Sequence, residues 1–193
     1  MTIERVFVVG AGLMGHGIAQ VLAVSGREVV LYEPDVARAV AGRERIAANL
    51  ARSVAKGRLD EADAETILAR GRTSDDPATV APADAVIEAV FEDADLKMRV
   101  WAELDRLAPP HALFASNTSS ISIDRLASAV SERRRARFVG MHFFSPVPVM
   151  PLVELIRGGA TDDEPADAVR ALAADLGKQV IVSADRPGFI VNR

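Results

Sequence analysis

The chain has 193 residues, of which 49% are apolar and 26% are charged, enough apolar material for one globular domain with a core. A formal net charge of −4 argues against general nucleic-acid binding, and we interpret the charged run at residues 132–135 as a solvated surface turn. The absence of cysteine excludes disulfides, a thiolate nucleophile and a cysteine metal site, and we expect no metal.

The cellular location is predicted from what the sequence lacks. The first residues run directly into an apolar strand and show no long apolar segment or cleavage site of a signal peptide. No apolar stretch approaches the roughly 20 residues needed to span a bilayer. We therefore expect a cytoplasmic protein that does not bind a membrane.

Predicted strands and helices alternate along the chain. Strands are expected at 5–9, 28–32, 85–89, 112–115, 138–142, 152–157 and 179–182. Helices are expected at 13–25, 97–107, 123–130 and 163–176, and a proline-rich loop at 143–151. Residues 35–71 show helical spacing interrupted by Gly57, which predicts a helical hairpin. This order predicts an α/β, Rossmann-type, doubly wound and mostly parallel sheet with an inserted helical hairpin.

A glycine-rich loop follows the first predicted strand. Gly10, Gly12 and Gly15 form a G-x-G-x-x-G motif that opens the first helix. The first glycine allows the tight turn, the second lets a pyrophosphate approach the backbone, and the third allows close packing of helix on strand. The free N–H groups of the helix start attract the phosphates. With a strand before it and a helix after it, this motif predicts a dinucleotide site.

Glu33 ends the second predicted strand, about twenty residues after the loop. A carboxylate at that place binds the adenosine ribose hydroxyls and repels a 2′-phosphate, so NAD is favoured over NADP. The same loop can bind FAD, so it does not determine the chemistry alone. The alternative interpretation is a turn without a ligand and an exposed glutamate.

Four further stretches and the glycine loop carry a family resemblance. They are Glu88–Glu92 with Lys97, Ala115–Ser120, Gly140–Pro146 with Leu152–Glu154, and Pro187–Arg193. In order and spacing they resemble the L-3-hydroxyacyl-CoA dehydrogenases, from about residue 4 to the last residue. One departure is Ser145, where the family usually has Asn.

An alcohol dehydrogenase needs a base for the hydroxyl proton and a cofactor for the hydride. His142 is the best candidate base because imidazole titrates near neutral pH, although a core histidine bonded to backbone is the alternative. Glu154 on the next strand can orient the imidazole and stabilise its charged form. Ser119 can bind the substrate oxygen, or it is an ordinary turn residue. We expect His16 on a helix surface and His111 in a turn.

The resemblance implies specific roles for these residues and others. His142 and Glu154 match the catalytic pair, Ser119 contacts substrate and cofactor, and Asn192 helps to hold the substrate oxygen. Glu92 and Lys97 match contacts to the nicotinamide half of NAD, although without the resemblance both look like surface helix charges. The expected cofactor-binding set is Gly10, Gly12, Leu13, Met14, Gly15, Glu33, Ala89, Glu92, Lys97, Asn117, Ser119 and Ser145.

Arg52 and Lys56 lie one turn apart on the predicted hairpin. They can pair with the phosphates of coenzyme A, or they form an ordinary solvated helix face. The resemblance also implies a second, helical domain after Arg193 that dimerises and closes over the substrate. We expect that domain to be absent from this chain, so that residues 1–193 are an NAD-binding domain that is weakly active or inactive alone. We expect the full-length parent to be a homodimer through that domain.

The function expected is reversible, NAD-dependent oxidation of an L-3-hydroxyacyl-CoA to the 3-ketoacyl-CoA, in fatty-acid or butanoyl-CoA metabolism. A second interpretation is an NAD-dependent dehydrogenase of a sugar acid, and activity with acetoacetyl-CoA separates the two. A third is a non-catalytic NAD-binding module, which binding without turnover would favour.

Overall fold

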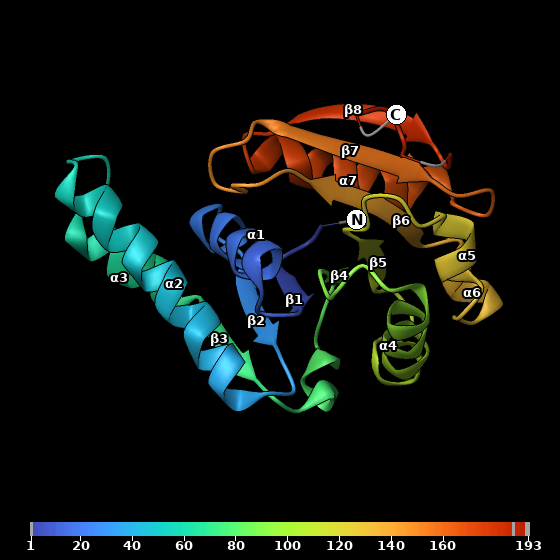
Figure 1. Ribbon diagram of the computed structural model, residues 1–193, viewed down its shortest axis with the longest axis horizontal. Helices are drawn as coiled ribbons and strands as arrows, with labels where there is room; N and C mark the ends of the chain where they lie inside the picture. Colours follow the sequence, from blue (N-terminus) through green and yellow to red (C-terminus); the bar gives the residue numbers. More distant parts are fainter. Residues whose placement is uncertain (1, 187, 192–193) are drawn as a thin grey trace.

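Eight strands form one sheet in the computed structural model, which describes residues 2–186 and 188–191. The strands are β1 (Arg5–Val9), β2 (Glu28–Tyr32), β3 (Gly71–Ser74), β4 (Ala85–Glu88), β5 (Leu113–Ser116), β6 (Phe138–Phe143), β7 (Leu152–Arg157) and β8 (Gln179–Ala184). Their order across the sheet is β3-β2-β1-β4-β5-β6-β7-β8 (Figure 1).

The first six strands are parallel, and the direction reverses between β6 and β7. β7 and β8 are parallel to each other. The predicted doubly wound, mostly parallel sheet is therefore confirmed. β1 lies between β2 and β4. The chain therefore adds β2 and β3 on one side of β1 and then crosses to add β4 on the other side. In such sheets, ligands bind outside the carboxyl ends of the strands at this switch point.

Helices cover both faces of the sheet. They are α1 (Leu13–Val24), α2 (Val36–Ala55), α3 (Glu61–Ala69), α4 (Ala94–Leu107), α5 (Ile123–Ala127), α6 (Glu132–Arg135) and α7 (Asp163–Asp175), with a 3-10 turn η1 (Pro77–Val80). The predicted hairpin is present as α2 and α3, and its turn contains Gly57 at a positive φ of 64°. Figure 1 shows this hairpin running past the β2–β3 side of the sheet. Among the described residues, no helix is both long and apolar enough to cross a membrane.

Strand residues alternate between two apolar cores. Val6 and Val8 of β1 belong to the core shared with α1, α2 and α7, whereas Phe7 and Val9 belong to the core shared with α4 and α5. In the second core, the Trp101 ring lies 4.8 Å from the Phe114 ring, centroid to centroid. These two layers fix the sheet, and with it the strand ends that carry the site.

The structure differs from the sequence prediction at β3 and η1, which were not predicted. β3 has the sequence Gly-Arg-Thr-Ser, and among the described residues it pairs with β2 alone, at the sheet edge. Because an edge strand of four mostly polar residues buries little apolar surface, its sequence has no strand-like hydrophobic pattern. The remaining predicted elements are present, with bounds that differ by up to three residues.

The charged run at 132–135 is not the solvated turn expected from its sequence. It forms the short helix α6, and the Arg134 side chain is buried at 3% exposure. Arg134 forms an ion pair with Asp105 at 2.9 Å and donates a hydrogen bond of 2.6 Å to the Ala112 carbonyl. Its guanidinium also lies over the ring of Phe114, so this arginine packs against the second core.

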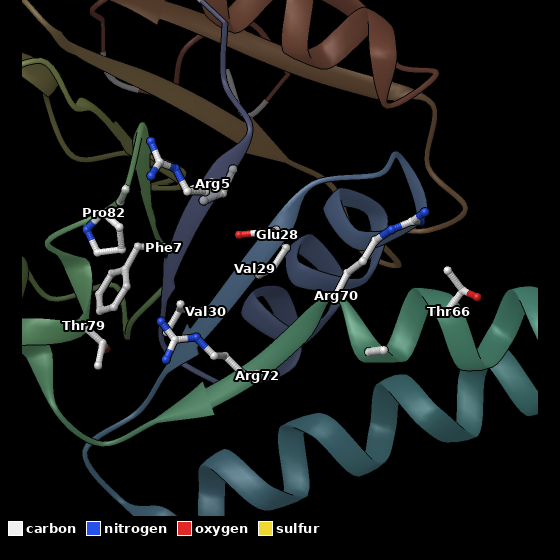
Figure 2. Close-up of a pocket in the computed structure, with 13 residues that line it drawn as sticks. Arg5, Phe7, Glu28, Val29, Val30, Thr66, Arg70, Arg72, Thr79 and Pro82 are labelled. Carbon is white, nitrogen blue, oxygen red and sulfur yellow. The ribbon is translucent and has the colours of Figure 1, made fainter.

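Cavities lie at both ends of the parallel strands. The first, of about 520 Å³, is near the amino ends of β1 and β2 and is lined by Arg5, Phe7, Glu28 and Arg72, among others (Figure 2). Arg5 is already paired with Asp84, and Arg70 donates a hydrogen bond to the Ala23 carbonyl. The second cavity lies at the carboxyl ends and contains the glycine loop.

Candidate active site

The glycine loop fits the backbone roles expected from its motif. Gly10 has a φ of +94°, and a side chain there would meet the Ala89 carbonyl at 2.8 Å. A Cβ atom at Gly15 would lie 1.7 Å from the Gly10 carbonyl, so this position requires glycine for packing. At Gly12, by contrast, a Cβ atom would meet no other atom within 4 Å, so the backbone there is open to a ligand. Helix α1 begins just after it without a side-chain cap, which leaves its N–H groups available to phosphate.

A cavity of about 430 Å³ adjoins this loop. Of the predicted cofactor residues, it is lined by Gly10, Gly12, Leu13, Met14, Glu33 and Ala89. Glu33 is buried rather than exposed, and its carboxylate accepts a 3.2 Å hydrogen bond from the Ala11 N–H. An open glycine, uncapped helix N–H groups and a fixed carboxylate are the parts that a dinucleotide requires, so these residues fit NAD.

His142 and Glu154 face each other across the antiparallel β6–β7 pair, where their Cα atoms are in register. The His142 Nδ1 atom lies 2.7 Å from Glu154 Oε2, and both side chains are buried. Because a carboxylate can only accept a hydrogen bond, the proton lies on Nδ1. The lone pair of Nε2 then points to the Ser119 hydroxyl at 3.1 Å. The structure thus brings together His142, Glu154 and Ser119, three of the predicted residues, in an arrangement that allows His142 to act as a general base.

The second oxygen of Glu154 binds the backbone of residues 190–191. Oε1 accepts hydrogen bonds of 3.0 Å from the N–H groups of both Ile190 and Val191. The sequence does not indicate this contact, because it joins residues 36 and 37 positions apart. Glu154 therefore orients the imidazole with one oxygen and anchors residues 190–191 with the other. Asn192, the predicted oxygen binder, lies outside the described residues.

An ion-pair cluster of buried Lys97 and Glu88 with exposed Glu92 lies beside this site. Lys97 is 1% exposed, and its Nζ atom lies 2.5 Å from Glu88 and 3.3 Å from Glu92. The fully buried Glu88 also accepts hydrogen bonds from the Ser116 hydroxyl and the Val90 N–H. Lys97 is therefore not a surface helix charge, and Glu88 joins the ends of β4 and β5 to α4.

Glu92 organises the loop that carries Ser119. Its Oε1 atom accepts hydrogen bonds from the Thr118 hydroxyl at 2.6 Å and from the Ser119 N–H at 2.8 Å. Burial opposes ionisation of Glu92, but the Thr118 hydrogen bond and the charge of Lys97 outweigh it, so the pKa of Glu92 lies below its ordinary value. The loop is consequently held by a carboxylate that is charged at neutral pH.

We expect Lys97→Met to destabilise the fold by about 3 to 5 kcal/mol, because it leaves the Glu88 carboxylate buried and unpaired. Urea unfolding measures the loss. Lys56→Met, at an exposed lysine, should change stability by no more than about 0.5 kcal/mol. Adding Glu88→Gln to Lys97→Met should restore part of the loss, and a loss below about 1 kcal/mol for Lys97→Met alone would contradict this account.

Asn117 and Ser145 lie on different parts of the site rim. The Asn117 side-chain oxygen accepts a 2.8 Å hydrogen bond from the Phe143 N–H, which ties the end of β5 to the end of β6. Ser145 is exposed in the proline-rich loop. Lys178 supports that loop, donating to the Val147 carbonyl at 2.7 Å and the Met150 carbonyl at 2.8 Å. Burial lowers the pKa of Lys178.

The two predicted coenzyme A residues are exposed on the hairpin. Arg52 is in the last turn of α2 and donates a hydrogen bond to Asn49. Lys56 follows that helix as its C-terminal cap. Neither lines the cavity that contains Gly12 and Glu33. Their role as phosphate ligands remains a prediction.

Comparison with known proteins agrees with the geometry. Residues 5–186 match the family model described as 3-hydroxyacyl-CoA dehydrogenase, NAD binding domain. The chain belongs to this family. It is 47% identical over 99% of its length to a 3-hydroxybutyryl-CoA dehydrogenase of Bradyrhizobium diazoefficiens, and 46% identical over 98% to one of Mycobacterium tuberculosis. The crystal structure of (S)-3-hydroxybutyryl-CoA dehydrogenase from Ralstonia eutropha matches all of the chain with a TM-score of 0.96 and 46% identity.

The chain spans only part of these relatives. It covers 64% of the Bradyrhizobium protein, 66% of the Mycobacterium protein and 67% of the Ralstonia structure. The part that it matches is the family's NAD-binding domain, so NAD is the cofactor of this domain.

Proposed function

We propose that this domain carries the base and cofactor site of an NAD-dependent dehydrogenase that interconverts L-3-hydroxyacyl-CoA and 3-ketoacyl-CoA. The observation that supports this most strongly is the chain of hydrogen bonds from Glu154 through His142 to Ser119. It stands on the strand ends of the same sheet that carries the glycine loop. The substrate class is supported by the family to which the chain belongs, 3-hydroxyacyl-CoA dehydrogenase, NAD binding domain.

When bound, NAD supplies the hydride acceptor for the secondary alcohol. His142 Nε2 accepts the hydroxyl proton, because its Nδ1 proton is already committed to Glu154. Glu154 stabilises the imidazolium that results, and the Ser119 hydroxyl holds the substrate oxygen. In the reverse direction, the imidazolium returns its proton to the ketone oxygen.

The remaining assignments are parts of the same proposal. Arg52 and Lys56 contact the coenzyme A phosphates, and Asn192 helps Ser119 to hold the substrate oxygen. Leu13, Met14, Ala89, Lys97, Asn117 and Ser145 contact the cofactor. The full-length parent is a cytoplasmic homodimer without nucleic-acid partners. Each of these stays a prediction.

NADH should bind at least tenfold more tightly than NADPH, a difference of about 1.4 kcal/mol, because Glu33 repels a 2′-phosphate. Fluorescence titration of the chain with each cofactor measures both affinities. NAD and NADP titrated in the same way serve as controls for the redox state. Equal affinities for NADH and NADPH would remove the role given to Glu33.

The substrate class is tested by offering three ketones to the chain with NADH. We expect oxidation of NADH with acetoacetyl-CoA and much less with acetoacetate or with a keto sugar acid. Turnover of the sugar acid in preference to the thioester would replace the proposed substrate. Tight NADH binding with no turnover of any ketone would support a non-catalytic binding module for this chain.

A further inference from the structure

Arg38 is a cation within the proposed cofactor site that neither the motif nor the family's name assigns. It lies in the first turn of α2, and its side chain is 49% exposed. Its Nη2 atom is 3.7 Å from Glu33 Oε2, while its guanidinium carbon lies 5.4 Å from the centroid of the Phe91 ring. The guanidinium is thus placed by an acid and an aromatic face.

This guanidinium stands between two hollows. It lines the cavity that contains Gly12, Glu33 and Phe91. It also lines a second hollow of about 380 Å³, together with Ala11, Gly12, His16 and Arg45. His16 was expected on a helix surface, but it is buried and its Nδ1 atom lies 2.7 Å from the Gly12 carbonyl. The acid and the arginine therefore both border the space beside the glycine loop.

Glu33 and Arg38 together can determine whether the site binds a cofactor with a 2′-phosphate. A carboxylate that binds the adenosine ribose hydroxyls meets any group attached to the 2′-oxygen. The negative charge of Glu33 repels a phosphate there, whereas an arginine nearby can accommodate it with several N–H donors. Glu33, 3.7 Å away, opposes the charge that Arg38 presents to an anion.

We propose that Arg38 is a specificity-determining residue: a ligand for the 2′-phosphate of NADPH that the Glu33 carboxylate masks. The proposal rests on the cofactor site described under the proposed function. In the natural chain, the pair favours NADH. Removing the charge of Glu33 alone exposes the guanidinium and turns the same site toward NADPH, without any new cation.

A double-mutant cycle tests this by NADPH titration, followed by fluorescence. Glu33→Gln keeps the size and an oxygen acceptor of the side chain, and should tighten NADPH binding at least tenfold over the natural chain. Glu33→Gln combined with Arg38→Ala should lose most of that gain, because the two residues act on the same phosphate. A thermal melt of each variant shows whether it is folded. Glu33→Ser, which also removes the charge, replaces Glu33→Gln if that variant does not fold.

The matched control is Arg45→Ala, at the other exposed arginine of the hollow that contains His16. Combined with Glu33→Gln, it should leave the NADPH gain nearly intact. The proposal is overturned if the gain survives Arg38→Ala, or if Arg45→Ala removes it equally. No acyl-CoA enters this assay, so failure to reduce acetoacetyl-CoA leaves its outcome unaffected, whereas failure of the natural chain to bind either cofactor would overturn the cofactor site itself.

Discussion

In a full-length parent, His142→Ala should lower the rate of acetoacetyl-CoA reduction by about 10² to 10⁴, the usual contribution of a general base or acid. The physical reason is geometric. The Nε2 atom of His142 is the basic atom 3.1 Å from the Ser119 hydroxyl, and the buried Glu154 fixes its tautomer. Without the imidazolium, water must supply the proton to the ketone oxygen from a position that no protein group fixes. Steady-state rates at saturating NADH measure the loss.

Two measurements separate chemistry from folding in this variant. NADH affinity should stay within about threefold of the natural chain, because His142 does not line the cavity that contains Gly12 and Glu33. His111→Ala, at an exposed histidine, should retain full activity. If His142→Ala kept most of its activity, the assignment of the base would be wrong.

Glu154→Gln should also lower turnover by about 10² or more, through the tautomer of His142. A glutamine has one carbonyl oxygen in place of two acceptors. If that oxygen accepts from the N–H groups of Ile190 and Val191, the amide N–H group faces Nδ1 of His142. Nδ1 must then accept, which places the proton on Nε2, the atom required as the base.

The alternative orientation of the glutamine keeps the His142 tautomer but releases residues 190–191. Either orientation breaks one of the two connections that the carboxylate makes. Imidazole nitrogen NMR signals of His142 distinguish the two orientations, since they report which nitrogen carries the proton. Glu61→Gln, at an exposed glutamate, is the matched control. Unchanged turnover in Glu154→Gln would show that the carboxylate has no role in orienting the base.

The sequence predicted the features that depend on local pattern. Strands such as Arg5–Val9 are apolar runs bounded by glycine, and the G-x-G-x-x-G motif fixes the turn that follows. The identity of the family followed from five motifs in order, and the family model confirms it. These features need no knowledge of which distant residues meet.

Burial of charged residues could not be read from the sequence. Lys97 shows the spacing of a surface helix residue, yet it is almost fully buried because Glu88 from β4 meets it. Arg134 is buried for a similar reason, since Asp105 and backbone carbonyls surround it. Such positions are set by pairing between different helices and strands, and their charges would be costly without those partners.

The central claim is that His142 transfers a proton to a 3-ketoacyl-CoA reduced by NADH bound to this domain. A single-turnover experiment tests it most directly. A full-length parent, at a concentration above its Kd for NADH, is mixed with NADH deuterated at C4 and with acetoacetyl-CoA, and the thioester is analysed by mass spectrometry. The account predicts 3-hydroxybutyryl-CoA carrying one deuterium at C3, and a rate at least about a hundredfold lower with His142→Ala. Bound NADH with no labelled product, or equal rates for the two proteins, would contradict it.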